Sequence, residues 1–133
     1  MMRLLPLGLF LALPTLTRTA ASSDPDIGCT SAVNVTEIYS AGAALGDYCV
    51  THGPISRETK VSWTLGSTRV YACNYSKTGT NPCSIAEIAA AWDQIQGRCG
   101  TGVGGWWYQR DWKKTYGFDN VNADWCGNMW GGQ

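Results

Sequence analysis

The sequence has a single histidine, His52, and no excess of positive charge. One histidine excludes histidine-rich metal centres and acid–base chemistry that uses two imidazoles. The chain carries 10 basic and 10 acidic residues, so its formal net charge is zero. Proteins that bind nucleic acid normally show a basic excess that neutralises phosphates. We therefore expect no nucleic-acid partner, and no residue pattern indicates a metal site or a cofactor.

The sequence also lacks a long apolar run beyond its amino terminus. Residues 1–21 have a basic residue, Arg3, near their start, continue with an apolar stretch over 4–13 and end in small residues. This order is typical of a secretory signal peptide, and the stretch is shorter than the ~20 apolar residues that span a bilayer. The sequence therefore predicts cleavage after residue 21 and a single secreted, extracellular domain over 22–133, without a membrane span.

Cysteine is abundant, with six residues, but no two of them form a CxxC pair. In an exported protein this predicts a framework of disulfide bonds rather than a zinc site. The candidate half-cystines are Cys29, Cys49, Cys73, Cys83, Cys99 and Cys126. A helix between Cys83 and Cys99 would hold them roughly 24 Å apart, whereas a disulfide tolerates about 7 Å between Cα atoms. The Cys83–Cys99 pairing is therefore excluded, and the other pairings stay open. We also expect the protein to be a monomer.

Two sequons for N-glycosylation occur in the chain, at Asn34 and at Asn74. Each asparagine is followed two positions later by the required hydroxyl residue, Thr36 or Ser76. Both asparagines are therefore candidate glycosylation sites of a secreted protein.

Residues 60–65 and 68–75 form the clearest β-hairpin in the sequence. They are joined by the two-residue connection Gly66-Ser67, and a glycine in the first position suits a tight hairpin turn. Such a turn fixes the register, so that Trp63 lies opposite Val70.

The same register decides which side chains of the hairpin share a face. Val61, Trp63, Val70 and Ala72 form an apolar face, and Cys73 falls on the opposite, polar face because side chains alternate along a strand. A disulfide at Cys73 then requires another segment of the chain to cover part of the polar face.

The sequence predicts one amphipathic helix, over residues 84–100. Ser84 and Glu87 make an S-x-x-E capping box, and apolar residues recur every three or four positions after it. Residues 32–52 contain two glycines and weak alternation, which predicts only short strands and loops there. Strands on both sides of one helix predict an α+β fold, a small disulfide-stapled antiparallel sheet with one amphipathic helix packed on it.

Five of the seven tryptophans lie within residues 106–130. Indole rings can fill a small core, stack on a sugar or anchor a protein partner. Adjacent residues of a strand point to opposite faces, and we expect Trp106 to lie inside and Trp107 to be exposed. The predicted binding patch consists of Trp107, Trp112, Lys113, Lys114 and Trp130.

Acidic residues give the clearest hint of catalysis, because paired carboxylates hydrolyse glycosidic bonds. The candidates for such a small hydrolase are Glu87, Asp93, Asp111, Asp119 and Asp124. The sequence places no two of them at a defined separation, and it contains no G-x-S-x-G, H-E-x-x-H or P-loop motif. We therefore expect that the protein is not an enzyme.

The order of motifs over residues 69–126 resembles small secreted cysteine-rich proteins of fungi, of the necrosis-inducing-factor and killer-toxin-like α/β-sandwich type. The motifs are Arg69-Val-Tyr-Ala-Cys73, Asn81-Pro-Cys83, the helix from Glu87 to Cys99, Gly105-Trp106-Trp107 and Tyr116-Gly117. The resemblance carries over no catalytic residue. It implies a virulence or antagonism factor that acts by binding a host or competitor protein. The alternative is a cell-wall carbohydrate-binding module that stacks exposed tryptophans on a glycan.

Overall fold

The structure is a computed structural model that describes residues 25–123 and 125–127, so the predicted signal peptide lies outside the described residues. Five strands and two helices form within this part of the chain. In chain order they are β1 (Asp26–Ala32), α1 (Val35–His52), β2 (Thr59–Leu65), β3 (Thr68–Asn74), α2 (Ile85–Cys99), β4 (Val103–Gln109) and β5 (Lys114–Asn120).

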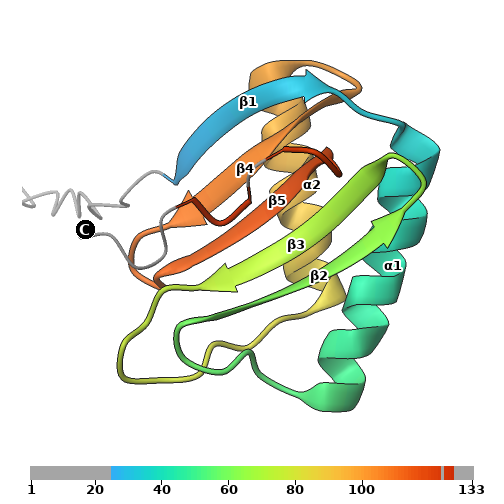
Figure 1. The fold of residues 1–133 in the computed structure, drawn as a ribbon. Helices are drawn as coiled ribbons and strands as arrows, with labels where there is room; N and C mark the ends of the chain where they lie inside the picture. The colour runs from blue at the N-terminus through green and yellow to red at the C-terminus, as the bar shows by residue number, and fades with distance from the viewer. Residues whose placement is uncertain (1–24, 124, 128–133) are drawn as a thin grey trace, which may run out of the picture.

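The strands make one antiparallel sheet in the order β1-β4-β5-β3-β2. Figure 1 shows both helices behind this sheet, so that one face is covered by helices and the other carries none within the described part of the chain. The predicted α+β class with a disulfide-tied antiparallel sheet is confirmed. The expectation of a single helix is wrong, because α1 is a second one.

The β2–β3 hairpin has the register that its two-residue connection predicts. Trp63 pairs with Val70, and Leu65 pairs with Thr68 across the turn. Gly66 adopts a φ of +57°, a value that residues with a Cβ adopt rarely. The short turn therefore fixed the face of every side chain in these two strands.

Helix α2 begins after Ser84, whose hydroxyl accepts a hydrogen bond from the Glu87 backbone N–H at 3.2 Å. It ends at Gly100, which has a φ of +98°. Half of the predicted capping box is therefore present. The Glu87 carboxylate is used elsewhere, because it accepts hydrogen bonds from the side chains of Lys114 and Tyr116.

Helix α1 was missed because small residues form much of its buried face. Asn34 caps its first turn by accepting a hydrogen bond from the Glu37 N–H, and Gly53 follows its last turn. Between these signals the buried residues are Ile38, Ala41, Gly42, Leu45, Gly46 and Cys49. Glycine and alanine contribute little to a hydrophobic periodicity. Gly42 and Gly46 are also residues that are more typical of loops than of helices.

The two glycines of α1 allow close packing between the helices. A Cβ at Gly46 would lie 2.9 Å from the Cβ of Ile85, closer than such atoms approach in proteins. A Cβ at Gly42 would lie 3.5 Å from the side chain of Ile88. The glycines thus let α1 and α2 approach each other over this part of their length.

Three disulfides tie the elements together and leave no free cysteine among the described residues. Cys29–Cys99 joins β1 to the end of α2, and Cys49–Cys83 joins the last turn of α1 to the segment before α2. Cys73–Cys126 joins β3 to the segment after β5. The excluded Cys83–Cys99 pairing is indeed absent. The prediction that another segment covers Cys73 is confirmed, because residues 125–127 lie over that face.

Most of the core lies between the helices and the sheet. Its fully buried side chains include Ile38 and Leu45 of α1, Ile95 of α2 and Phe118 of β5. Neither helix within the described residues is both long and apolar enough to cross a bilayer.

Candidate functional site

The structure brings together part of the predicted binding patch, but not as an exposed surface. Trp112 and Lys113 are exposed in the turn between β4 and β5, whereas Trp107 and Lys114 are buried on the helix-covered face. Trp130 lies outside the described residues. The expected exposure of Trp107 and Lys114 is therefore wrong. The Trp112 ring lies 6.0 Å from the Trp107 ring, and Lys114 Nζ lies 5.1 Å from the centre of the Trp112 ring. These three residues therefore meet, but of the three Trp112 alone is exposed.

The two neighbouring tryptophans of β4 have the opposite arrangement from the expected one. Trp107 is 6% exposed and Trp106 is 37% exposed. Trp107 pairs with Tyr116, whose side chain faces the helices, and its ring lies 6.4 Å from the Tyr116 ring. The alternation along the strand was predicted correctly, but the sequence does not say which face of the strand the helices cover.

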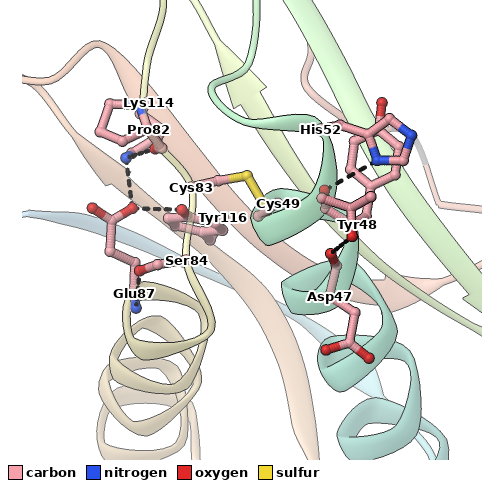
Figure 2. The surroundings of a disulfide bond; sticks show 11 residues. Asp47, Tyr48, Cys49, His52, Pro82, Cys83, Ser84, Glu87, Lys114 and Tyr116 are labelled. Atoms are coloured by element: carbon pink, nitrogen blue, oxygen red, sulfur yellow. Dashed lines mark hydrogen bonds and ion pairs between the residues drawn. A yellow bond between two sulfur atoms is a disulfide. The ribbon is translucent and has the colours of Figure 1, made fainter.

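Lys114 is held in a polar cluster at the start of α2. Its Nζ donates to the Glu87 carboxylate and to the Pro82 carbonyl oxygen, both at 2.6 Å. Tyr116 donates its hydroxyl hydrogen to the same carboxylate at 2.5 Å, and Figure 2 shows these groups converging beside Cys49–Cys83. Burial, with the Glu87 contact, raises the pKa of Tyr116 above its usual 10.0. This cluster fastens β5 to α2.

The helix-free face is covered by aromatic rings that lie on glycines. A Cβ at Gly117 would lie 1.9 Å from the ring of Tyr71, and a Cβ at Gly28 would lie 2.1 Å from the ring of Trp106. The two glycines therefore make room for rings that lie against the backbone. Tyr71 is buried beneath Trp125, at 5.6 Å between ring centroids, whereas Trp106 keeps an exposed surface.

A polar cluster accompanies these rings. The buried Asp119 carboxylate accepts hydrogen bonds from the hydroxyls of Thr30 and Tyr71. Burial raises the pKa of Asp119, although these two hydrogen bonds act in the opposite direction. Nearby, Lys60 and Arg69 lie 4.1 and 4.8 Å from the centre of the Trp125 ring.

An open apolar groove runs between α1 and α2 on the far side of the molecule from Trp106. Its volume is about 320 Å³, within the range of natural ligand pockets. It is lined by Ile38, Tyr39, Gly42, Ala43, Ile85, Ile88, Ala89, Trp92, Asp93 and Phe118.

The groove follows from the way in which the two antiparallel helices pack. The helices touch at Gly46 and Ile85, and the groove lies toward the start of α1 and the middle of α2. The ring of Trp92 lies 5.1 Å from that of Phe118, and both rings belong to the lining. Tyr39 stands at the groove with 64% of its surface exposed.

Among the described residues, Glu87, Asp93 and Asp119 do not come together as a hydrolytic pair. Glu87 is bonded to Lys114, Asp119 lies on the opposite face of the sheet and Asp93 lines the groove. Asp124 lies outside the described residues. His52 stacks on Tyr48 in the last turn of α1, and no group of metal-ligating side chains gathers within residues 25–123 and 125–127.

The two glycosylation sequons lie in very different surroundings. Asn74 is fully buried, and its Nδ2 donates to three backbone carbonyls, those of Ile55, Ser56 and Gly79. A glycan on this nitrogen is incompatible with the fold, so the expectation at Asn74 is wrong. Asn34 is exposed and remains a predicted site.

No family model, no curated protein and no solved structure matches this chain. Its function therefore has to be inferred from the geometry of its own residues. The groove was not predicted, because one of its walls is the helix that was missed. The sequence does contain signals for the two ends of α1. Asn34, three residues before Glu37, is a typical helix N-cap, and Gly53 directly follows the last turn.

Proposed function

We propose that this protein is a secreted effector that acts outside the cell by binding a host or competitor protein, without catalysis. An amino-terminal segment typical of a signal peptide and three disulfides support an extracellular site of action. The groove between α1 and α2 is the surface that we assign to the partner.

The observation that carries this proposal is the apolar character of that open groove. Its walls are Tyr39 and Ala43 of α1 and Ile85 and Ala89 of α2, and all four side chains are exposed. Exposed apolar surface of this kind marks interaction sites in soluble proteins. The Cys49–Cys83 bond fixes the two helices close to the point where they touch, so the groove is formed before a partner arrives.

The test uses two alanines that are neighbours on α2. Ala89 lines the groove, whereas Ala90 is exposed and lies outside it. Ala89→Lys places a long charged side chain in the groove, and Ala90→Lys adds the same charge and the same helix propensity beside it. The oxidised proteins are infiltrated into plant tissue and added to competing microbes, and the dose that produces a response is measured.

We expect the wild type and Ala90→Lys to act at the same dose, and Ala89→Lys to require at least a tenfold higher one. Absence of any response to the wild type, in tissue and in microbes, would remove the effector function. Equal activity of the two variants would remove the groove as the binding surface.

Trp106 favours a second candidate function, a carbohydrate-binding module. Its ring lies against Gly28 with one side exposed, and Tyr108 stands two residues along on the same face of β4. A ring held flat on a sheet is a suitable platform for stacking on a sugar. The exposed Trp112 of the predicted binding patch does not belong to this platform, because its ring lies against Trp107 and Lys114 of the helix-covered face.

Retention on chitin, cellulose and glucan separates the two functions. A carbohydrate-binding module is retained, and Trp106→Ala abolishes the retention, whereas Trp63→Ala on the helix-covered face leaves it unchanged. Passage of the wild type through all three polysaccharides would eliminate this candidate.

A further inference from the structure

The two edge strands of the sheet differ in how well they are protected against pairing with another chain. The register of β1 with β4 shifts between Cys29 and Ala32, and Cys29 is also bonded to α2. In contrast, β2 pairs with β3 at all seven positions without a shift. It contains no proline and one charged side chain, Lys60. Edge strands are usually protected against pairing with another chain by irregular register, prolines or charged side chains. Strand β2 has a regular register, no proline and a single charge.

The hairpin turn decides which backbone groups of β2 point outward. A two-residue connection makes the flanking Leu65–Thr68 pair a hydrogen-bonded one, and such pairs alternate along an antiparallel ladder. The N–H and C=O groups of Lys60, Ser62 and Thr64 therefore point away from β3. Within the described residues no strand pairs with this edge.

Apolar side chains also remain exposed along this edge. Trp63 and Leu65 project toward the helix-covered face with 45% and 43% of their surfaces exposed, and Val61 beside them is half-buried. A second strand added at this edge would cover them.

We propose, in place of the monomer expected from the sequence, that two copies of this chain pair antiparallel along β2 about a twofold axis at Ser62. Ser62 is the midpoint of the seven-residue strand, so this register uses the whole strand and joins outward-pointing groups to one another. Trp63 then lies against the partner's Val61, and Lys60 lies against the partner's Thr64. The single charge of the strand thus meets a neutral residue, and no like charges face each other. The dimer has one continuous ten-stranded sheet.

The dimer lies on a different surface from the α1–α2 groove, so the two proposals are tested independently. Sedimentation velocity of the oxidised protein, purified from a secreting host, is measured from about 1 to about 100 µM. We expect a dimer for the wild type. Ser62→Lys and Ser62→Asp each place like charges across the twofold axis, and each raises the dissociation constant at least tenfold. An equimolar mixture of these two variants restores a dimer.

Two further variants change Thr64, an exposed residue of β2. Thr64→Lys faces the partner's Lys60 and weakens the dimer, whereas Thr64→Glu faces the same lysine and tightens it. Ser31→Lys adds the same charge at the β1 edge and leaves the dissociation constant unchanged. A wild type that is monomeric at every concentration would overturn the proposal, and so would a mixture of Ser62→Lys and Ser62→Asp that stays monomeric.

Discussion

The two faces of this sheet are covered in different ways. On one face, α1 and α2 bury a continuous set of aliphatic and aromatic side chains, with Phe118 at 1% exposure. On the other face, rings such as Tyr71 lie on glycines of the neighbouring strands, and residues 125–127 cross over them. Figure 1 shows the chain after β5 turning back over this helix-free face.

The two faces therefore contribute unequally to the stability of the domain and to its exposed surface. The helix-covered face carries the larger core, and its outer surface leaves a groove open between the helices. The helix-free face has a small second cluster around Tyr71, Cys73 and Cys126. We therefore expect mutations on the helix-covered face to cost the most stability, because buried apolar contact is the main stabilising term.

The largest effect is expected for Phe118→Ala. The ring is fully buried against Trp92, and its removal leaves a cavity that costs about 3–5 kcal/mol of unfolding free energy. Trp106→Ala removes a larger ring from the helix-free face but costs only about 1 kcal/mol, because part of that ring is already exposed to water. Urea denaturation measures both values, and equal losses would contradict the division between the faces.

Loss of the Cys73–Cys126 bond is expected to have the next largest effect. The two cysteines are 53 residues apart, and replacing both by alanine costs about 2–4 kcal/mol, mainly through the greater freedom of the unfolded chain. The double variant of Cys49 and Cys83 loses a similar amount, and it alone reduces binding in the α1–α2 groove. Reduced binding in the Cys73 and Cys126 variant would show that the two faces are coupled.

The smallest effects concern the pH dependence of stability. The contributions of Asp119 on the helix-free face and Glu37 of α1 are expected to change with pH in opposite directions. Burial raises the pKa of Asp119 above its usual 3.8, so its contribution to stability is fully present below that value and falls as the pH rises through the raised pKa. Hydrogen bonds from Thr68 and Ser67 lower the pKa of Glu37 below its usual 4.5, so its contribution is present above that value and is lost as the pH falls through the lowered pKa.

Denaturation between about pH 2 and about pH 7 compares the wild type with Asp119→Asn and Glu37→Gln. The advantage of the wild type over Asp119→Asn shrinks as the pH rises, whereas its advantage over Glu37→Gln grows. Parallel curves for all three proteins would contradict both assignments.

Local signals predicted the elements that they control directly. The Gly66-Ser67 connection gave the register of β2 and β3, and Ser84 gave the start of α2. The position of Cys73 on the polar face also predicted that another segment covers this face. In each of these cases a few neighbouring residues determine the geometry.

Features that depend on distant residues were not predicted. Gly42 and Gly46 resemble helix breakers until Ile85 and Ile88 lie against them. Lys114 resembles a surface lysine until α2 packs on the same face of the sheet and Glu87 forms an ion pair with it. The candidate site was not predicted for the same reason. Its groove is formed by α1 and α2 together, and these helices are far apart in the sequence.

The three disulfides hold both helices and the carboxyl-terminal segment against the sheet, so identification of the cysteine pairs tests this fold most directly. Proteolysis of the oxidised protein under non-reducing conditions, followed by mass spectrometry, should yield peptides linked through Cys29–Cys99, Cys49–Cys83 and Cys73–Cys126. Free thiols, or a bond between Cys49 and Cys73, would contradict this arrangement of helices and sheet, because those two residues would then join opposite faces of the sheet.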